Sequence, residues 1–175
     1  MGWVLEKITG KKFADLVSEL IWQPMGAESD AYITTDSAGN ARPAGGMCAT
    51  TRDIARVGQL VLDDGRGIVP ADWIQDMLNN GSNEAFSAGA WTGYQRVLGR
   101  LAYRSYWVAN SQDQLLMGLG VHGQMLFVDR INGIVMAKTS SQPERTDRNK
   151  SALTILAFKE FQRLLAKEAN GELQV

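Results

Sequence analysis

The spacing of the apolar residues changes near Gly89, and this change constrains the fold more than any other feature of the chain. Before Gly89, apolar residues recur every three or four positions, which is typical of amphipathic helices. After it, four segments favour strands, with Asn132-Gly133 as a hairpin signal, and a final helical pattern follows. Helices, then antiparallel strands, then one helix predict an α+β fold, an antiparallel sheet with flanking helices. The four predicted strands are 103–108, 115–121, 124–129 and 134–139.

Several helix boundaries can be located from residues that cap helices. Thr50 followed by Asp53 has the spacing of a capping box. Pro70 suits the first position of the next helix. Either Thr146 or Asp147 is expected to cap the last helix. The inward face of that helix is expected to be formed by Leu153, Leu156, Ala157, Phe161, Leu164 and Leu165.

The chain divides into two portions of one domain. Residues 1–90 are expected to form a helical portion, and residues 91–175 the antiparallel strands and the C-terminal helix. Within the first portion, residues 79–89 are expected to form a polar loop. Helical spacing places three tryptophans on core faces, namely Trp3, Trp22 and Trp73.

Composition excludes several classes of function. The chain has 175 residues, 45% of them apolar, and a net charge of -1, which suits one folded domain and argues against a nucleic-acid binder or a polybasic membrane anchor. No apolar run reaches the length of a membrane-spanning helix. A single cysteine excludes an internal disulfide and a multi-cysteine zinc site, a single histidine excludes His-rich metal sites, and no cofactor is expected. No secretory signal opens the chain, which slightly favours the cytoplasm and leaves the periplasm open.

Cys48 and His122 are the first candidates for chemistry. Cys48 precedes a capped helix, whose N-terminus would favour a thiolate, but a small buried hydrophobe in a turn is the favoured interpretation. His122 stands between Gly120 and Gly123 and could line a cleft. From the residues alone, a half-buried turn histidine bonded to a backbone carbonyl is favoured. A cysteine-based activity that combines Cys48 with His122 remains the weakest of the hypotheses for function.

Other motifs carry less weight. Gly118-Leu119-Gly120 lies between two strands, so a dinucleotide site is rejected in favour of a strand with a bulge or a close crossing. Lys138-Thr139-Ser140 invites comparison with the Lys-Thr-Gly box of penicillin-recognising enzymes, but a solvated strand end is expected. No serine is followed three residues later by lysine. Trp91 and Trp107 are candidates for a cleft wall, although core packing is favoured.

Two longer segments resemble a known family. Residues 45–58 (GGMCATTRDIARVG) resemble a segment of the serine β-lactamase-like family of class C type, which includes penicillin-binding proteins, esterases and 6-aminohexanoate-dimer hydrolases. Residues 118–129 (GLGVHGQMLFVD) resemble the third-strand region of the 6-aminohexanoate-dimer hydrolase branch, and residues 133–136 and 140–143 continue the likeness. Residues 2–11 resemble the helix that follows the tyrosine motif of the family.

The resemblance implies a fold, a mechanism and a set of site residues. The chain would be the C-terminal portion of a β-lactamase-like fold. In the family, a serine attacks an amide or ester carbonyl, a lysine and a tyrosine handle its proton, and backbone N–H groups stabilise the oxyanion. The strand donor would here be the N–H of Val121, with Gly120, His122 and Gly123 on the substrate side. Gly118-Leu119-Gly120 would replace the Lys-Thr-Gly box, which puts β-lactam recognition in doubt.

The resemblance also implies an absence. The Ser-x-x-Lys and Tyr-x-Asn motifs of the family would lie upstream of Met1, so the chain is expected to be inactive alone and to act on a small amide or ester only when completed. The missing strands would leave a sheet edge and an apolar surface open, which predicts self-association, binding of a complementary fragment, or poor stability. The alternative hypothesis is a non-catalytic interaction module or one half of a split enzyme.

Overall fold

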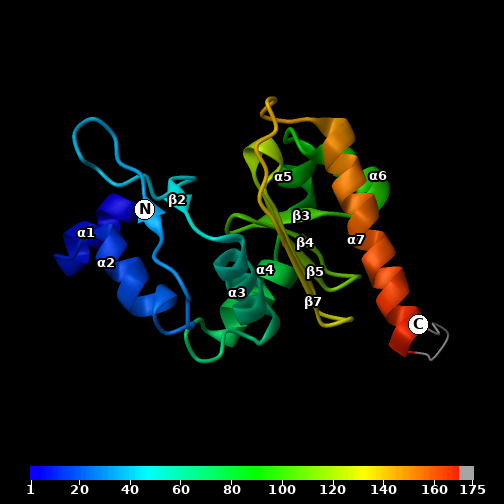
Figure 1. Cartoon of the computed structure of the whole chain (residues 1–175), viewed down its shortest axis with the longest axis horizontal. Coiled ribbons are helices and arrows are strands. Elements are labelled where there is room, and N and C mark those ends of the chain that lie inside the picture. Colours follow the sequence, from blue (N-terminus) through cyan, green and yellow to red (C-terminus); the bar gives the residue numbers. More distant parts are fainter. Residues whose placement is uncertain (170–175) are drawn as a thin grey trace.

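Helices cover both faces of a five-stranded antiparallel sheet in the computed structural model, which describes residues 1–169 (Figure 1). Helices α3 (Thr51–Leu62) and α4 (Ala71–Asn79) pack on one face, and α7 (Arg148–Ala169) packs on the other. The predicted α+β class, an antiparallel sheet with flanking helices, is confirmed. Helices α3 and α4 precede residue 90 and nevertheless pack on the sheet. The division at residue 90 stays a prediction. Its second portion includes residues 170–175, which lie outside the described residues.

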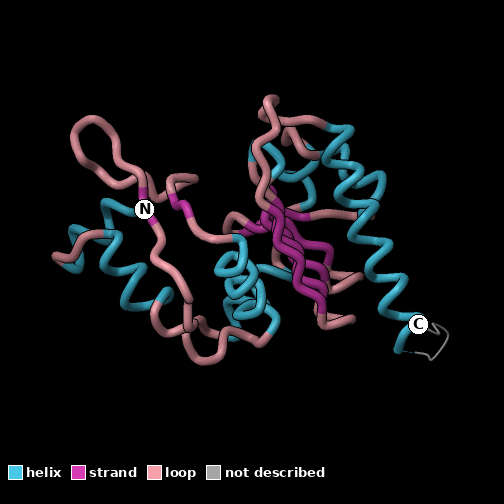
Figure 2. The backbone as a smooth tube through the Cα atoms, in the orientation of Figure 1, coloured by secondary structure: helices cyan, strands magenta, loops and turns pink. Residues whose placement is uncertain are grey.

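The sheet is a simple meander in which each strand pairs with the next along the chain (Figure 2). Successive residues of its strands face opposite sides of the sheet, and each side packs against a separate hydrophobic core. Val108, Met117 and Phe127 face α7, whereas Leu116 and Val128 face α3 and α4. The last three predicted strands are confirmed, with ends shifted by one or two residues. The strands are β3 (Ala102–Arg104), β4 (Trp107–Asn110), β5 (Leu115–Leu119), β6 (Met125–Asp129) and β7 (Ile134–Lys138).

The predicted strand 103–108 is wrong, because this segment is a hairpin rather than one strand. Its chain reverses at Ser105 and Tyr106, whose φ angles of 49° and 68° are both positive. Strand β3 therefore ends at Arg104, which pairs with Trp107 across the turn. A two-residue turn of this kind usually contains asparagine or glycine, so the sequence carried no signal for it.

The remaining elements are short and lie mostly in the N-terminal part of the chain. Gly10, with φ of 70°, ends the first helix in the left-handed conformation. The polar loop predicted for residues 79–89 is wrong, since Ser82 caps a helix there by accepting a hydrogen bond from the N–H of Ala85. These elements are α1 (Gly2–Thr9), α2 (Phe13–Val17), η1 (Ser18–Trp22), β1 (Tyr32–Ile33), β2 (Met47–Cys48), α5 (Asn83–Ser87), η2 (Thr92–Tyr94) and α6 (Gln95–Leu98).

The start of α3 is fixed by a buried carboxylate. Thr50 Oγ1 accepts a hydrogen bond from the N–H of Asp53 at 3.1 Å, which confirms the predicted cap. The Asp53 carboxylate accepts the N–H of Glu28 at 2.8 Å and lies 3.0 Å from the Arg56 guanidinium. The Glu28 amide, followed by Thr50 and Arg56, lowers the pKa of Asp53 below its ordinary value of 3.8. This carboxylate therefore ties the loop at residue 28 to the start of the helix.

The lowered pKa of Asp53 predicts an acid-sensitive contribution to stability. The contribution is present above the ordinary pKa of 3.8 and is lost as the pH falls through the lowered value of the folded state. We expect Asp53→Asn to unfold at a lower temperature than the parent at neutral pH, and the gap between the two to narrow in acid. Thermal unfolding between about pH 3 and about pH 7 checks this, and a gap that does not change with pH would contradict it.

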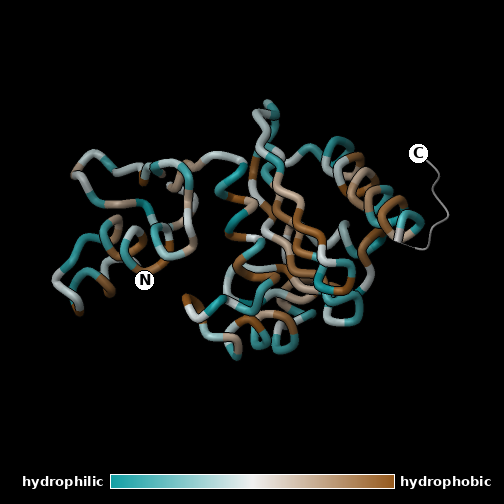
Figure 3. Tube along the Cα trace, turned by 60° about the horizontal axis from the view of Figure 1, so that its bottom comes forward, coloured by the Kyte–Doolittle hydropathy of each residue, from teal (hydrophilic) through white to brown (hydrophobic). Residues whose placement is uncertain are grey.

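The inward face predicted for α7 is largely wrong. Ile155 and Phe158 are fully buried against the sheet, whereas five of the six predicted residues are exposed, namely Leu153, Leu156, Ala157, Phe161 and Leu165. The helix is apolar on more than one side, as its hydropathy shows (Figure 3), so periodicity could not tell which side meets the sheet.

Of the three tryptophans predicted on core faces, Trp22 is buried but Trp3 and Trp73 are exposed. None of the helices within residues 1–169 is both long and apolar enough to cross a membrane.

The exposed side of α7 lies beside the open edge of β7. Met136 and Lys138 of β7 share a shallow groove with Leu153, Ala157 and Phe161. Among the described residues, β7 pairs only with β6, so its other edge carries unpaired backbone groups. An apolar stripe next to an unpaired strand edge favours association with another chain.

We expect this edge to pair with the same edge of a second copy, so that the apparent mass rises with protein concentration. Phe161→Glu places a charge in the stripe and should hold the chain as a monomer, whereas Lys159→Glu, on the same helix but outside the stripe, should not. Size-exclusion chromatography with light scattering measures both masses. A monomer at every concentration, or equal behaviour of the two variants, would contradict the prediction.

Candidate functional site

The candidate site is a tight turn at the end of β5. Strand β5 ends at Leu119, Gly120 continues in extended conformation, and Val121–Gly123 form the short helical turn η3. His122 and Gly123 both have positive φ angles, 57° and 83°. This conformation is uncommon for a residue with a side chain, so His122 is held in place by its surroundings. The turn reverses the chain into β6.

Some backbone amides of this turn donate hydrogen bonds within the protein and others do not. The N–H of Gly120 donates to the Gln124 carbonyl at 2.9 Å, and the N–H of His122 donates to the Arg145 carbonyl at 2.9 Å. The N–H of Gln124 reaches back to the Val121 carbonyl at 3.4 Å. The N–H of Val121 has no acceptor within residues 1–169, and the residue is 41% exposed. A fixed and unused N–H donor at the surface is the element from which an oxyanion hole is built.

The imidazole of His122 is half-buried and bonded to the backbone. Its Nδ1 lies 2.9 Å from the carbonyl oxygen of Gln142, and the Gln142 N–H donates to the His122 carbonyl at 3.2 Å. Because a carbonyl oxygen can only accept, neutral His122 carries its proton on Nδ1 and leaves Nε2 as an acceptor. The ring is therefore oriented by the segment that follows β7, and its remaining nitrogen can receive a proton or a hydrogen bond.

Both glycines of the turn are required by close packing. A Cβ at Gly120 would lie 2.8 Å from Cβ of Gln124, and a Cβ at Gly123 would lie 2.5 Å from the side-chain nitrogen of Gln142. Gly123 also has the positive φ that disfavours a side chain. Gly118 is different, because it pairs with Leu126 in an unbroken ladder, and the expected bulge is absent there.

The segment 138–140 fastens the turn rather than ending in solvent. The Nζ of Lys138 donates to the Gly123 carbonyl at 2.9 Å, and Ser140 N–H donates to the Gln124 side chain at 3.0 Å. The exposed Thr139 is 2.8 Å from the hydroxyl of Thr51 on α3. The expected solvated strand end is therefore wrong for Lys138, because the strand pairing of β6 with β7 carries its side chain back to the turn.

The other sequence candidates lie elsewhere. Cys48 is exposed in strand β2, so the expectation of a buried cysteine in a turn is wrong. No hydrogen bond within residues 1–169 joins Cys48 to His122, whose Nδ1 is engaged by Gln142. Trp107 is half-buried against the core below α3 and α4, and Trp91 is half-buried against the core below α7. Both therefore pack against a core, and Trp91 also lines a cavity.

Sequence reasoning missed the residues that hold the turn. Lys138, Gln142 and Arg145 lie 15 to 23 residues beyond it, and two of them act through backbone carbonyls. A carbonyl contact depends on the path of the chain and leaves no residue pattern. The lysine could have been found from strand pairing, since the register places Lys138 opposite Met125, next to the turn.

Comparisons with known proteins identify the family. A family model described as Beta-lactamase matches residues 1–159. A 6-aminohexanoate-dimer hydrolase from Paenarthrobacter ureafaciens is 32% identical over 154 residues, which are 85% of this chain and 38% of that protein. The chain thus spans well under half the length of this curated relative.

Solved structures agree on the fold. A protein described as a 6-aminohexanoate-dimer hydrolase from Bacillus anthracis superposes with a TM-score of 0.75 at 26% identity, over 99% of this chain and 42% of that chain. The simvastatin synthase LovD from Aspergillus terreus superposes with a TM-score of 0.67 at 16% identity, over 88% of this chain and 49% of its own. The β-lactamase-like fold inferred from the sequence is confirmed. The chain belongs to the β-lactamase family of hydrolases.

Proposed function

We infer that this chain forms part of a serine hydrolase that cleaves small amides or esters through an acyl-enzyme, with the nucleophile lying outside these 175 residues. One observation carries the proposal. The N–H of Val121 has no acceptor within residues 1–169 and stands at the end of a strand, between the engaged amides of Gly120 and His122. A free donor held between two hydrogen-bonded amides is suited to an oxyanion hole. The sequence contains no serine followed three residues later by lysine, so the attacking group must come from elsewhere.

The chain would contribute binding and charge stabilisation rather than attack. As a nucleophile adds to the substrate carbonyl, negative charge gathers on its oxygen, and the Val121 N–H would donate to that oxygen. Gly120, His122 and Gly123 would border the substrate, with Nε2 of His122 free to accept a hydrogen bond. The Paenarthrobacter relative is named for a linear amide, which supports an open-chain amide or ester as substrate. The absence of a Lys-Thr-Gly box at residues 118–120 argues against β-lactams.

A chimera tests the proposal. This chain replaces the matching 38% of the Paenarthrobacter hydrolase, and the purified chimera is assayed on a p-nitrophenyl ester and on the amide for which the relative is named. We expect measurable turnover and labelling by a serine-reactive phosphonate. A chimera that folds, as judged by circular dichroism, but neither turns over nor reacts would contradict the proposal.

The same experiment separates the alternative, a non-catalytic interaction module or one half of a split assembly. The missing Ser-x-x-Lys motif favours this reading of the chain taken alone. A folded but inactive chimera would support the interaction module. An active chimera would support the hydrolase and would agree with a split enzyme only if the chain and its counterpart also assemble as separate polypeptides.

A further inference from the structure

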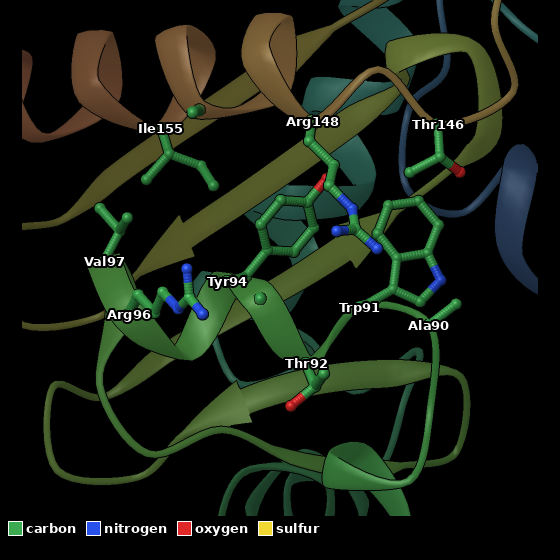
Figure 4. Close-up of a pocket in the computed structure, with 11 residues that line it drawn as sticks. Ala90, Trp91, Thr92, Tyr94, Arg96, Val97, Thr146, Arg148 and Ile155 are labelled. Carbon is green, nitrogen blue, oxygen red and sulfur yellow. The ribbon is translucent and has the colours of Figure 1, made fainter.

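A second cavity lies between the α6 region and the start of α7 (Figure 4). Its volume is about 310 Å³, which is within the range of sites for small ligands. Trp91, Tyr94 and Val97 line it on one side, and Ala152 and Ile155 of α7 line it on the other. No residue of the 118–124 segment takes part, so the cavity is separate from the proposed catalytic turn.

The cavity is positively charged. Arg96 and Arg148 are among its lining residues, and none of the lining residues is an aspartate or glutamate. Neither arginine has a carboxylate within 4.0 Å in residues 1–169, whereas Arg104 and Arg163 form ion pairs elsewhere on the surface. Two guanidinium groups without an acidic partner, set around one apolar cavity, favour an anion that can accept bidentate hydrogen bonds.

A buried polar atom lies beside one of these two arginines. Tyr94 is 8% exposed, and its hydroxyl, which lies beside the Arg148 side chain in Figure 4, has no hydrogen-bond partner within the described part of the chain. Burial raises the pKa of this hydroxyl, and the nearby Ser151 and Arg148 oppose the rise only in part. A buried hydroxyl without a partner is costly, so an acceptor that reached it would be favoured.

Aromatic and apolar side chains form much of the cavity wall. The rings of Trp91 and Tyr94 are 5.5 Å apart and tilted by 41°, so their faces enclose one side of the space. Ala152 and the buried Ile155 add small and apolar side chains to the wall. A flat ring can therefore lie against the indole among apolar contacts.

We propose that this cavity binds a small monocarboxylate with an aryl body. The carboxylate pairs with Arg148, within reach of the Tyr94 hydroxyl once the Arg148 side chain turns toward the anion. The aryl group lies against the Trp91 indole, among the apolar lining residues of the cavity. This assignment is independent of the proposed hydrolase activity, because it uses none of the residues of the turn at Val121.

Titration of the ¹⁵N-labelled chain with 4-phenylbutyrate tests the proposal. The indole N–H resonance of Trp91, assigned with Trp91→Phe, is expected to shift with a Kd of about a millimolar, the scale for a ligand of this size. The neutral analogue 4-phenylbutyramide should bind at least about fivefold more weakly, since it forms no ion pair. No shift at about 10 mM carboxylate, or equal binding of acid and amide, would overturn the proposal.

Variants locate the binding. Arg148→Gln should weaken 4-phenylbutyrate about fivefold, whereas Arg163→Gln, on the same helix and ion-paired with Glu160, should leave it unchanged. Ala152→Phe should abolish the Trp91 shift by filling part of the cavity that both residues line. Binding that survives Ala152→Phe would show that the ligand lies outside the cavity and would contradict the assignment. Circular dichroism of each variant shows whether it remains folded. The ratio of the Kd values for the carboxylate and the amide is measured on the parent chain, so this test holds even if a variant fails to fold.

Discussion

Replacing Phe158 by alanine is expected to lower the free energy of unfolding by about 3–5 kcal/mol, the largest single effect on stability that we predict. Phe158 is fully buried, and its ring stacks on that of Phe127 with 4.5 Å between the centroids. It is one of two fully buried apolar residues through which α7 meets the sheet, the other being Ile155. Because Phe127 lies in the middle of β6, the substitution would leave a cavity at the centre of this core. Shifts of surface side chains could not fill a cavity at that depth.

Phe161 provides the matched control. It is the same residue type on the same helix, three positions further on, and it is 52% exposed. Phe161→Ala should cost less than about 1 kcal/mol, because little surface is removed from water at that position. Urea unfolding followed by circular dichroism measures both variants. Equal losses at the two positions would mean that α7 does not pack on the sheet as described.

The second large effect concerns the donor at Val121. In the active chimera, Val121→Pro removes the N–H and is expected to lower kcat about 10²–10³-fold, as loss of one oxyanion donor does in other acyl-transfer enzymes. The backbone before this position can accept proline, because Gly120 is extended, with φ of −108° and ψ of 165°. The substitution therefore removes the hydrogen-bond donor while the strand leading to it keeps its path.

Val121→Ala is the control, since it shortens the side chain and keeps the N–H. It should retain activity within about threefold of the chimera that carries valine, because the proposed role belongs to the backbone. Steady-state kinetics on the p-nitrophenyl ester compare the two. Equal kcat for the proline and alanine variants would remove Val121 from the mechanism, and a strong loss in both would indicate that the side chain, rather than the N–H, is needed.

The parts of the fold that could be predicted from sequence are those with local signals. Strands β5 to β7 are short, nearly continuous apolar runs with a turn signal at Asn132-Gly133, and Thr50 has the side chain and spacing of a helix cap. The hairpin at Ser105-Tyr106 was missed because two residues without a preference for positive φ adopt positive φ angles under the constraint of the neighbouring strand pairs. Tertiary packing decided that conformation, and local preference did not.

The orientation of α7 shows a different limit. Its sequence carries one apolar stripe through Ile155 and Phe158 and another through Leu153 and Phe161. Both have helical spacing, so the pattern alone could not indicate which stripe faces the sheet. The larger number of apolar residues favoured the second stripe, and the structure buries the first.

The candidate site was reached through resemblance rather than through residue chemistry. The role proposed for Val121 belongs to a backbone N–H, which every residue except proline carries, so no side-chain search could have found it. The structure adds what the resemblance lacked. It shows that the neighbouring amides of Gly120 and His122 are engaged while that of Val121 is not, and that Gln142 and Arg145 hold the turn.

The most direct test of the central claim is an assay of the chain as it stands. The purified chain of 175 residues is incubated with a p-nitrophenyl ester and, in parallel, with a serine-reactive phosphonate probe followed by intact-mass measurement. If the chain supplies an oxyanion donor but no nucleophile, hydrolysis will equal the uncatalysed background and no mass will be added. Turnover that the probe abolishes, together with one added label, would mean that a serine within this sequence is the nucleophile and that the account is wrong.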